Sequence, residues 1–210
     1  MNRIRRRICG KRDFIIKDNF VFNPDIFKLN VGYLDGYWQS PLYFSNIEDE
    51  IKSIYHFPIE QIVDHKNRCI IDAIQRTESV SIHIRRTDYL KYPDLYPNLS
   101  ESKYYERSIE YIKNKLGNKC HYFIFSDDIV WCKDNLHVDN CTFIDWNNGD
   151  YFWIDMYLMS ICKHNIIANS TFSWWSAYLN KNASSIQIAP KLWSYDYRMN
   201  DIYTEKMIVI

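Results

Sequence analysis

From residue 79 onward, short apolar segments alternate with helical ones, and this alternation limits the chain to few folds. Segments rich in Val, Ile and Phe, as expected of buried strands, occupy residues 80–84, 122–125, 142–145, 165–168 and 185–189. Apolar residues recur at helical spacing over 101–116, over 150–163 and from residue 171 through 179. Strands linked by helices form parallel sheets with helices on both faces. We therefore expect a doubly wound, Rossmann-like α/β domain over residues 78–210.

Residues 1–77 carry a weaker pattern. Short apolar runs predict strands at 14–17 and 20–22, and an aromatic, turn-rich stretch follows at 32–41. Residues 46–56 and 64–77 are predicted to be helical. Ser100 is expected to cap the start of the 101–116 helix and Gly117 to close it. The change of pattern predicts a weak domain boundary near residue 77.

The charge balance argues against one large class of partner. The chain has 26 basic and 26 acidic residues and a formal net charge of zero, whereas a general nucleic-acid binder needs a basic surface. Hydrophobic residues make up 47% of the chain, enough for a folded core. The aromatic content of 17% fits a protein that handles sugars and equally fits a core of large side chains.

Cysteine usage and the N-terminus bear on location. The six cysteines form no Cys-x-x-Cys pair and no zinc-type spacing, which favours free thiols in a reducing compartment. No apolar run reaches the ~20 residues that span a bilayer, and no signal peptide is recognisable. We expect a cytoplasmic protein. A basic cluster either is a solvated terminus or gives loose, peripheral contact with an anionic inner membrane surface. It comprises Arg3, Arg5, Arg6, Arg7, Lys11 and Arg12.

Three polar clusters follow predicted strands, at residues 83–88, 126–128 and 169–173. Parallel strands bring their carboxyl ends to one edge of the sheet, where such folds bind ligands. In the first cluster, strand alternation places His83 and Arg85 on one face and Arg86 on the other. Paired arginines match the oxygens of a diphosphate. The alternatives are surface ion pairs, for example with Asp88, and a core role for His83.

The other two clusters also have two interpretations. Asn169, Ser170 and Thr171 lead into a helix, whose free N–H groups favour an anion, although Ser170 or Thr171 can equally be a simple N-cap. Ser126, Asp127 and Asp128 either begin a helix or offer a carboxylate to the N–H groups of a base such as guanine.

Asp155 stands in an apolar helical segment, where a structural partner is the favoured explanation over a functional one. Several common nucleotide and metal motifs are absent. The sequence has no P-loop, no Gly-x-Gly-x-x-Gly and no Asp-x-Asp pair for a divalent ion. Arginines can take over the electrostatic role of such a metal.

Together these motifs resemble the α-1,2-fucosyltransferases of glycosyltransferase family 11. The resemblance rests on His-x-Arg-Arg-x-Asp at 83–88, Ser-Asp-Asp at 126–128 and Asn-Ser-Thr-Phe-Ser-Trp-Trp at 169–175. Gly-Tyr-Trp-Gln-Ser at 36–40 and Ile-Ala-Pro-Lys-Leu-Trp at 188–193 agree with it, so that it covers most of residues 30–210.

The resemblance implies a GT-B-like fold of two Rossmann-like halves. It implies transfer of L-fucose from GDP-fucose to the 2-hydroxyl of a galactose-terminated glycan, with inversion and with no metal or other cofactor. Arg85 and Arg86 would hold the diphosphate. Asn169, Ser170, Thr171 and Ser173 would line the same site, with His83 beside them and an acidic residue of 126–128 near the base. Asp88 is the candidate general base.

Family members begin with a Gly-rich strand-to-helix segment that is not found here. We therefore expect residues 1–77 to be the remnant of an N-terminal, acceptor-side half with its linker helices, and residues 78–210 to bind the GDP-sugar. Two other hypotheses stay open. One is a remnant that binds GDP without transfer, and the other is a structural protein that keeps the fold without a ligand.

Overall fold

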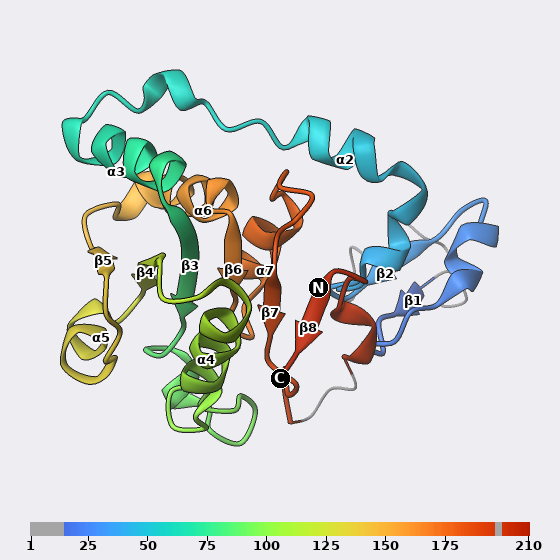
Figure 1. Cartoon of the computed structure of the whole chain (residues 1–210). Helices are drawn as coiled ribbons and strands as arrows, with labels where there is room; N and C mark the ends of the chain where they lie inside the picture. The colour runs from blue at the N-terminus through green and yellow to red at the C-terminus, as the bar shows by residue number, and fades with distance from the viewer. Residues whose placement is uncertain (1–14, 196–198) are drawn as a thin grey trace.

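The computed structural model describes residues 15–195 and 199–210. Six strands form one sheet in the order β5-β4-β3-β6-β7-β8, and every neighbouring pair is parallel (Figure 1). This confirms the expected α/β sheet. The strands are β3 (Glu78–Ile84), β4 (Cys120–Ser126), β5 (Cys141–Ile144), β6 (His164–Ile166), β7 (Gln187–Ala189) and β8 (Met207–Val209).

The order of the strands reverses beside β3. The chain moves outward from β3 through β4 to β5, then returns to place β6 on the opposite side of β3. Loops that leave β3 and β6 at their carboxyl ends therefore diverge, and such a reversal opens a crevice for ligands. Residues 85–88 follow β3 and residues 169–171 follow β6, so the fold brings the first and third polar clusters to this point.

Helices cover both faces of the sheet. On one face α4 (Tyr104–Leu116) and α5 (Ile129–Asn135) pack on Val80, Ile82 and Ile84 of β3. On the other face lie α3 (His65–Arg76), α6 (Phe152–Ile161) and α7 (Thr171–Tyr178). His83 belongs to this second face, where its ring lies 5.6 Å from that of Phe172. The strand alternation read from the sequence is therefore confirmed for β3.

The N-terminal part packs against the sheet domain. β1 (Ile15–Lys17) and β2 (Tyr33–Asp35) form a two-stranded parallel sheet, and α2 (Glu48–Ile54) leads into a linker that passes over the amino ends of the large sheet to α3 (Figure 1). Phe44, Ile51 and Phe57 pack on the apolar cluster around α7. The predicted boundary near residue 77 falls between α3 and β3 and stays a prediction.

Some local predictions were wrong. The predicted 101–116 helix begins at Tyr104, after Lys103 in the left-handed region (φ 58°), and Ser100 does not cap it because its Oγ bonds Asn98 and Arg86 instead. Residues 20–22 form no strand, because Phe20 has a φ of 62°. β2 and β8 had not been predicted. Gly117, with a φ of 77°, closes α4 as expected.

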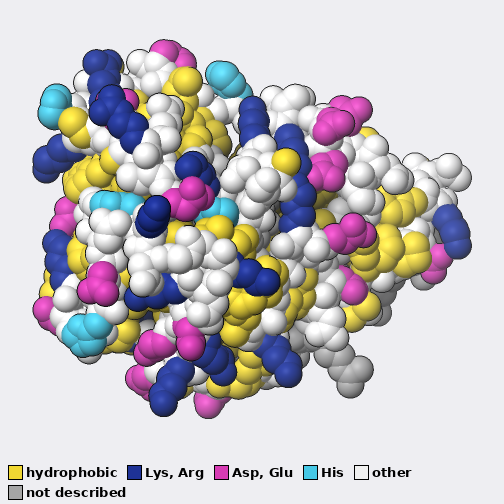
Figure 2. Space-filling view, viewed as in Figure 1, with side chains coloured by type: hydrophobic (Ala, Val, Ile, Leu, Met, Phe, Trp, Pro, Cys, Tyr) yellow, Lys and Arg dark blue, Asp and Glu magenta, His cyan; other side chains and the backbone are white. Residues whose placement is uncertain are grey.

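The surface carries both signs of charge. Figure 2 shows Lys and Arg side chains interspersed with Asp and Glu over the visible face, and apolar side chains gathered over the part that holds β1 and β2. Within the described ranges, no helix is long and apolar enough to cross a membrane. The basic cluster at residues 3–12 lies outside the described residues.

Candidate functional site

A cavity of about 580 Å³ opens at the carboxyl ends of β3, β4 and β6. Residues that follow β3 and β4 form one side of it, while the loop before α6 and the start of α7 form the other. Seven of the predicted site residues line it, which places the polar clusters of the sequence at one cavity. They are His83, Arg85, Asp88, Ser126, Asp127, Ser170 and Thr171.

Arg85 is the cation of this cavity. Its Nη2 donates to Asp88 Oδ2 at 2.7 Å, and its Nε lies 3.4 Å from Asp127 Oδ2. The guanidinium side chain is 35% exposed, so it is held in place while still open to a ligand. Carboxylates outnumber cations among the lining residues. Binding of an anion here therefore depends on Arg85 and on the N–H groups at the start of α7.

Arg86 lies on the opposite face of the sheet and does not line the cavity. Its guanidinium carbon is 3.9 Å from the centre of the Trp131 ring, and its Nε donates to Asp128 Oδ2 at 3.2 Å. Only 9% of the residue is exposed. The two expected arginines, which follow the end of β3, therefore point to opposite sides of the sheet, and Arg86 is a structural cation in this geometry.

This assignment makes a prediction about stability. Removing one partner of a buried ion pair leaves the other charge uncompensated, which costs roughly 3–5 kcal/mol. Because the Asp128 side chain is 29% exposed, we expect Arg86→Ala to lower the free energy of unfolding by less, about 2 kcal/mol. Denaturant unfolding of the variant, compared with Arg107→Ala on the exposed face of α4, measures this. An Arg86→Ala protein with parental stability and lost GDP binding would contradict the assignment.

The side chains of the acidic cluster after β4 already take part in hydrogen bonds within the protein. Asp127 accepts hydrogen bonds from the backbone N–H groups of Arg86 and Thr87, at 2.9 and 3.1 Å, and from the Thr87 hydroxyl at 2.6 Å. Asp128 caps α5 by accepting from the N–H of Trp131. Ser126 Oγ accepts from the N–H of Asp128. For Asp128 the helix-start alternative is therefore the one that the structure supports.

The loop before α7 divides into structural and open residues. Asn169 Nδ2 donates to the Trp193 carbonyl, and the fully buried Ser173 hydroxyl bonds the loop at Ala168 and Ser170. These two side chains shape the loop and do not line the cavity. Ser170 occupies the N-cap position, but its side chain makes no capping hydrogen bond. Ser170 and the exposed Thr171 therefore stand at an uncapped helix N-terminus that borders the cavity.

Asp155 lines the cavity but is not among the site residues that the sequence predicts. It lines the cavity from α6, and Asn147 Nδ2 donates to its Oδ1 at 2.7 Å. Asn147 is itself fixed by paired amide hydrogen bonds with Asn67. Burial raises the pKa of Asp155 to about 7. The sequence signal for this residue was a carboxylate in an apolar helix. In the structure Asp155 both bonds a structural partner, Asn147, and faces the cavity.

His83 lines the same cavity as a neutral ring. Burial lowers the pKa of His83 to about 4. Its Nδ1 is buried, and no hydrogen bond reaches it from any residue that the structure describes. An unpartnered buried polar atom is costly and is uncommon outside functional sites. Because Asp155 and His83 both line the cavity, it suits a ligand with several hydrogen-bonding groups.

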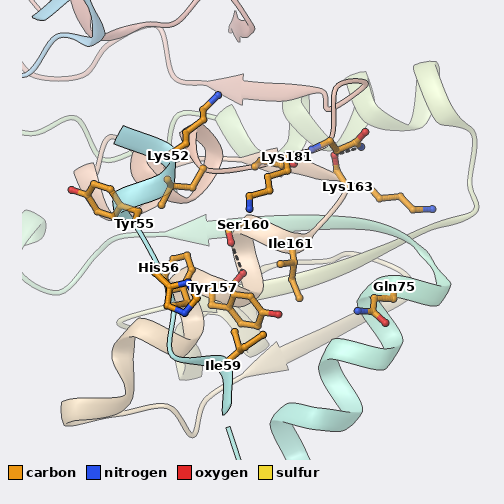
Figure 3. Close-up of a pocket in the computed structure, with 14 residues that line it drawn as sticks. Lys52, Tyr55, His56, Ile59, Gln75, Tyr157, Ser160, Ile161, Lys163 and Lys181 are labelled. Atoms are coloured by element: carbon orange, nitrogen blue, oxygen red, sulfur yellow. Dashed lines mark hydrogen bonds between the residues drawn. The ribbon is translucent and has the colours of Figure 1, made fainter. Parts of the chain in front are cut away.

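Another cavity, of about 500 Å³, lies toward the amino ends of the strands (Figure 3). The linker after α2 and the ends of α6 and α7 enclose it. Lys181 reaches toward Ser160, whereas Lys163 points away and pairs with Glu78 at 3.1 Å. It contains none of the predicted site residues. Among the residues described, no three His, Cys, Asp or Glu side chains gather as metal ligands.

Comparison with known proteins agrees with the motifs. The model of the family described as Glycosyl transferase family 11 matches residues 11–210. An Escherichia coli alpha-1,2-colitosyltransferase is 39% identical over 75% of this chain and 54% of its own length. The Escherichia coli O-antigen biosynthesis glycosyltransferase WbnK is 39% identical over 57% of this chain and 40% of its own. Human galactoside alpha-(1,2)-fucosyltransferase 1 is 29% identical over 48% of the chain and 28% of its own length. The chain spans about half, or less, of the curated relatives that it matches.

Proposed function

The chain belongs to glycosyltransferase family 11, and we propose that it binds GDP-fucose and transfers the fucose to the 2-hydroxyl of a galactose-terminated glycan. The observation that carries the proposal is the position of Arg85. It stands opposite the uncapped start of α7, at the point where the strand order reverses. A diphosphate between them would meet one guanidinium and several free N–H groups.

These groups also fit the charge that develops during transfer. Breaking the sugar–phosphate bond leaves negative charge on the departing GDP, and fixed donors stabilise such charge when they point at the leaving oxygens. Arg85 supplies a permanent charge, and Ser170 and Thr171 supply hydroxyl donors. We propose that these residues take the place of a divalent ion. Transfer that persists undiminished in chelator would support this, and loss that Mg²⁺ restores would contradict it.

We propose that Asp155 reads the base. The guanine edge presents an N–H and an amino group side by side, and a carboxylate accepts from both. Adenine lacks this pair of donors, and uracil has only one N–H. The rings of Phe152 and Phe172, whose centres are 6.2 Å apart, border the same end of the cavity and offer faces to the base. Asp155 thus takes the role that was expected of the 126–128 cluster.

Asp88 stays the proposed general base. Partial burial is the largest single influence and acts to raise the pKa of Asp88, but the hydrogen bond and charge of Arg85, together with backbone N–H groups, lower that pKa below its ordinary value. The carboxylate is therefore ionised at neutral pH and can accept a proton. Inversion at the anomeric carbon would follow from attack by the acceptor hydroxyl on the face opposite the diphosphate. The GT-B arrangement, with a second Rossmann-like half, is part of the same proposal.

Two alternatives differ in a measurable way. The colitosyltransferase relative suggests a donor sugar other than fucose, which a comparison of GDP-fucose with GDP-colitose would decide. A protein that binds GDP without catalysing transfer would move no labelled fucose to lactose. A fold without a ligand would bind neither nucleotide nor sugar.

Thermal stability in the presence of nucleotide gives a direct test. A ligand that binds only the folded state, at a hundredfold excess over its Kd, stabilises that state by about 2.7 kcal/mol. For a chain of this size that corresponds to a rise in Tm of roughly 5–10 °C. We expect GDP in chelator to produce this rise, and UDP and ADP at the same concentration to produce little. Equal responses to all three nucleotides, or to none, would contradict the proposed donor site.

A further inference from the structure

A second, smaller cavity adjoins the proposed donor site. It has a volume of about 310 Å³, and Tyr89, Tyr96 and Thr171 line both cavities. The rings of Tyr89 and Tyr96 are stacked, with centres 4.0 Å apart, and the Tyr89 hydroxyl donates to the Asn169 carbonyl. These residues form a rigid partition, so a ligand in one cavity lies next to a ligand in the other.

The two cavities differ sharply in charge. Arg85, Asp88, Asp127 and Asp155 line the first cavity, whereas no Lys, Arg, Asp or Glu is found among the described residues that line the second. The second cavity is formed by aromatic and aliphatic side chains with amides and hydroxyls among them. Its chemistry therefore suits a neutral ligand with both C–H surface and hydroxyl groups.

The carboxylate of Asp18 holds together the two segments that form one wall of this cavity. Asp18 Oδ1 accepts from the N–H of Phe20 at 2.8 Å, and Oδ2 accepts from the N–H groups of Tyr37 and Trp38 at 3.2 and 2.8 Å. Gly36 is required beside it, because a Cβ at that position would stand 2.1 Å from the Asp18 Cβ. Asp18 thereby joins two separate segments into one wall.

The same wall holds strained backbone. Phe20 and Trp38 both adopt the left-handed region, with φ values of 62° and 53°. Such conformations are uncommon for bulky residues and concentrate at binding sites, because surrounding contacts must stabilise them. Here the contacts from Asp18 do so. The result is that Phe20, Tyr37 and Gln39 line the cavity.

Tyr37 is the most informative side chain of the wall. It is 77% exposed, although its backbone is pinned by Asp18. Across the cavity the Trp193 ring is only 6% exposed and belongs to the core. An exposed aromatic ring on a rigid backbone offers its face to a ligand at low entropic cost.

We propose that this second cavity binds a neutral pyranose ring, with Tyr37 packing on its C–H face and Gln39 bonding its hydroxyls. The proposal rests on the proposed function, since the shared partition places the sugar beside the nucleotide. The ring is either the sugar of the donor or the galactose unit of the acceptor. Both share the chemistry that the cavity recognises.

The test compares three ligands on the intact chain by calorimetry: GDP, GDP-fucose, and methyl β-galactopyranoside in the presence of GDP. The variants are Tyr37→Ala and Gln39→Ala. The control is Tyr92→Ala, which removes a tyrosine that is 59% exposed and lines neither cavity. We expect Tyr37→Ala to raise the Kd of the sugar ligand roughly five- to tenfold, the scale of one aromatic contact, with the Kd of GDP unchanged.

The pattern of losses identifies the sugar. Weaker GDP-fucose binding with unchanged galactoside binding assigns the cavity to the donor sugar, and the reverse assigns it to the acceptor. Unchanged binding of both sugar ligands in Tyr37→Ala and Gln39→Ala would overturn the inference even if GDP binds. If the parent chain binds the galactoside but not GDP, and the two variants lose galactoside binding, the sugar site is supported and the proposed donor site is rejected.

Discussion

Replacing Arg85 by alanine should lower kcat/KM for fucose transfer by roughly 10²- to 10³-fold, the usual cost of removing one preorganised donor to a developing charge. The reason is specific to this cavity. Without Arg85 the charged residues of the lining would be the carboxylates Asp88, Asp127 and Asp155, which repel a diphosphate. GDP binding should weaken together with transfer.

Labelled fucose transfer to lactose measures the rate, and calorimetry with GDP measures binding even if transfer by this chain is slow. Arg76→Ala is the matched control, since that side chain is 81% exposed on α3 and lies outside the cavity. Arg85→Lys should recover only part of the loss, because an ammonium keeps the charge but not the planar fork. An Arg85→Ala protein with parental transfer and GDP affinity would refute the donor site.

Asp155→Asn should weaken GDP binding roughly 100-fold, because the amide keeps only one acceptor and turns a donor toward guanine or Asn147. The same substitution should also abolish the pH dependence of GDP affinity near pH 7. Burial raises the pKa of free Asp155 to about 7, and the N–H donors of guanine would favour its ionised form and lower that pKa in the complex. GDP affinity of the parent chain should therefore be highest above pH 7 and fall as the pH is lowered through 7.

Calorimetric titrations with GDP between pH 5.5 and 8.5, on the parent chain and on Asp155→Asn, would measure both effects. Asp134→Asn on the exposed side of α5 is a suitable control. Inosine diphosphate lacks the amino group of guanine, so the parent should prefer GDP to it and Asp155→Asn should lose that preference. Equal pH profiles for the two proteins would show that Asp155 does not contact the base.

The sequence predicted the strands of the sheet and the polar clusters at their carboxyl ends, because the patterns that indicate them are local. Alternating strand and helix patterns identified five of the six strands of the large sheet, and the carboxyl ends of these strands located the polar clusters. The period of two along the predicted strand, extended to the arginines that end it, placed His83 and Arg85 on one face and Arg86 on the other. That pattern already argued against a shared role for the two arginines, although both were assigned to the diphosphate.

Only the tertiary structure decided which of these side chains are open to a ligand. Arg86 and Asp128 are 42 residues apart, so no local pattern shows that they pair with each other and are unavailable to a ligand. Asn67 and Asn147 are 80 residues apart, so no local pattern shows that this amide pair positions Asp155. The hydrogen bonds of Asp18 likewise join Asp18 to Tyr37 and Trp38, which are 19 and 20 residues away. Composition and periodicity determine what each segment forms and which face is polar. Hydrogen bonds between distant segments determine which polar groups are already satisfied, and those that are left define the site.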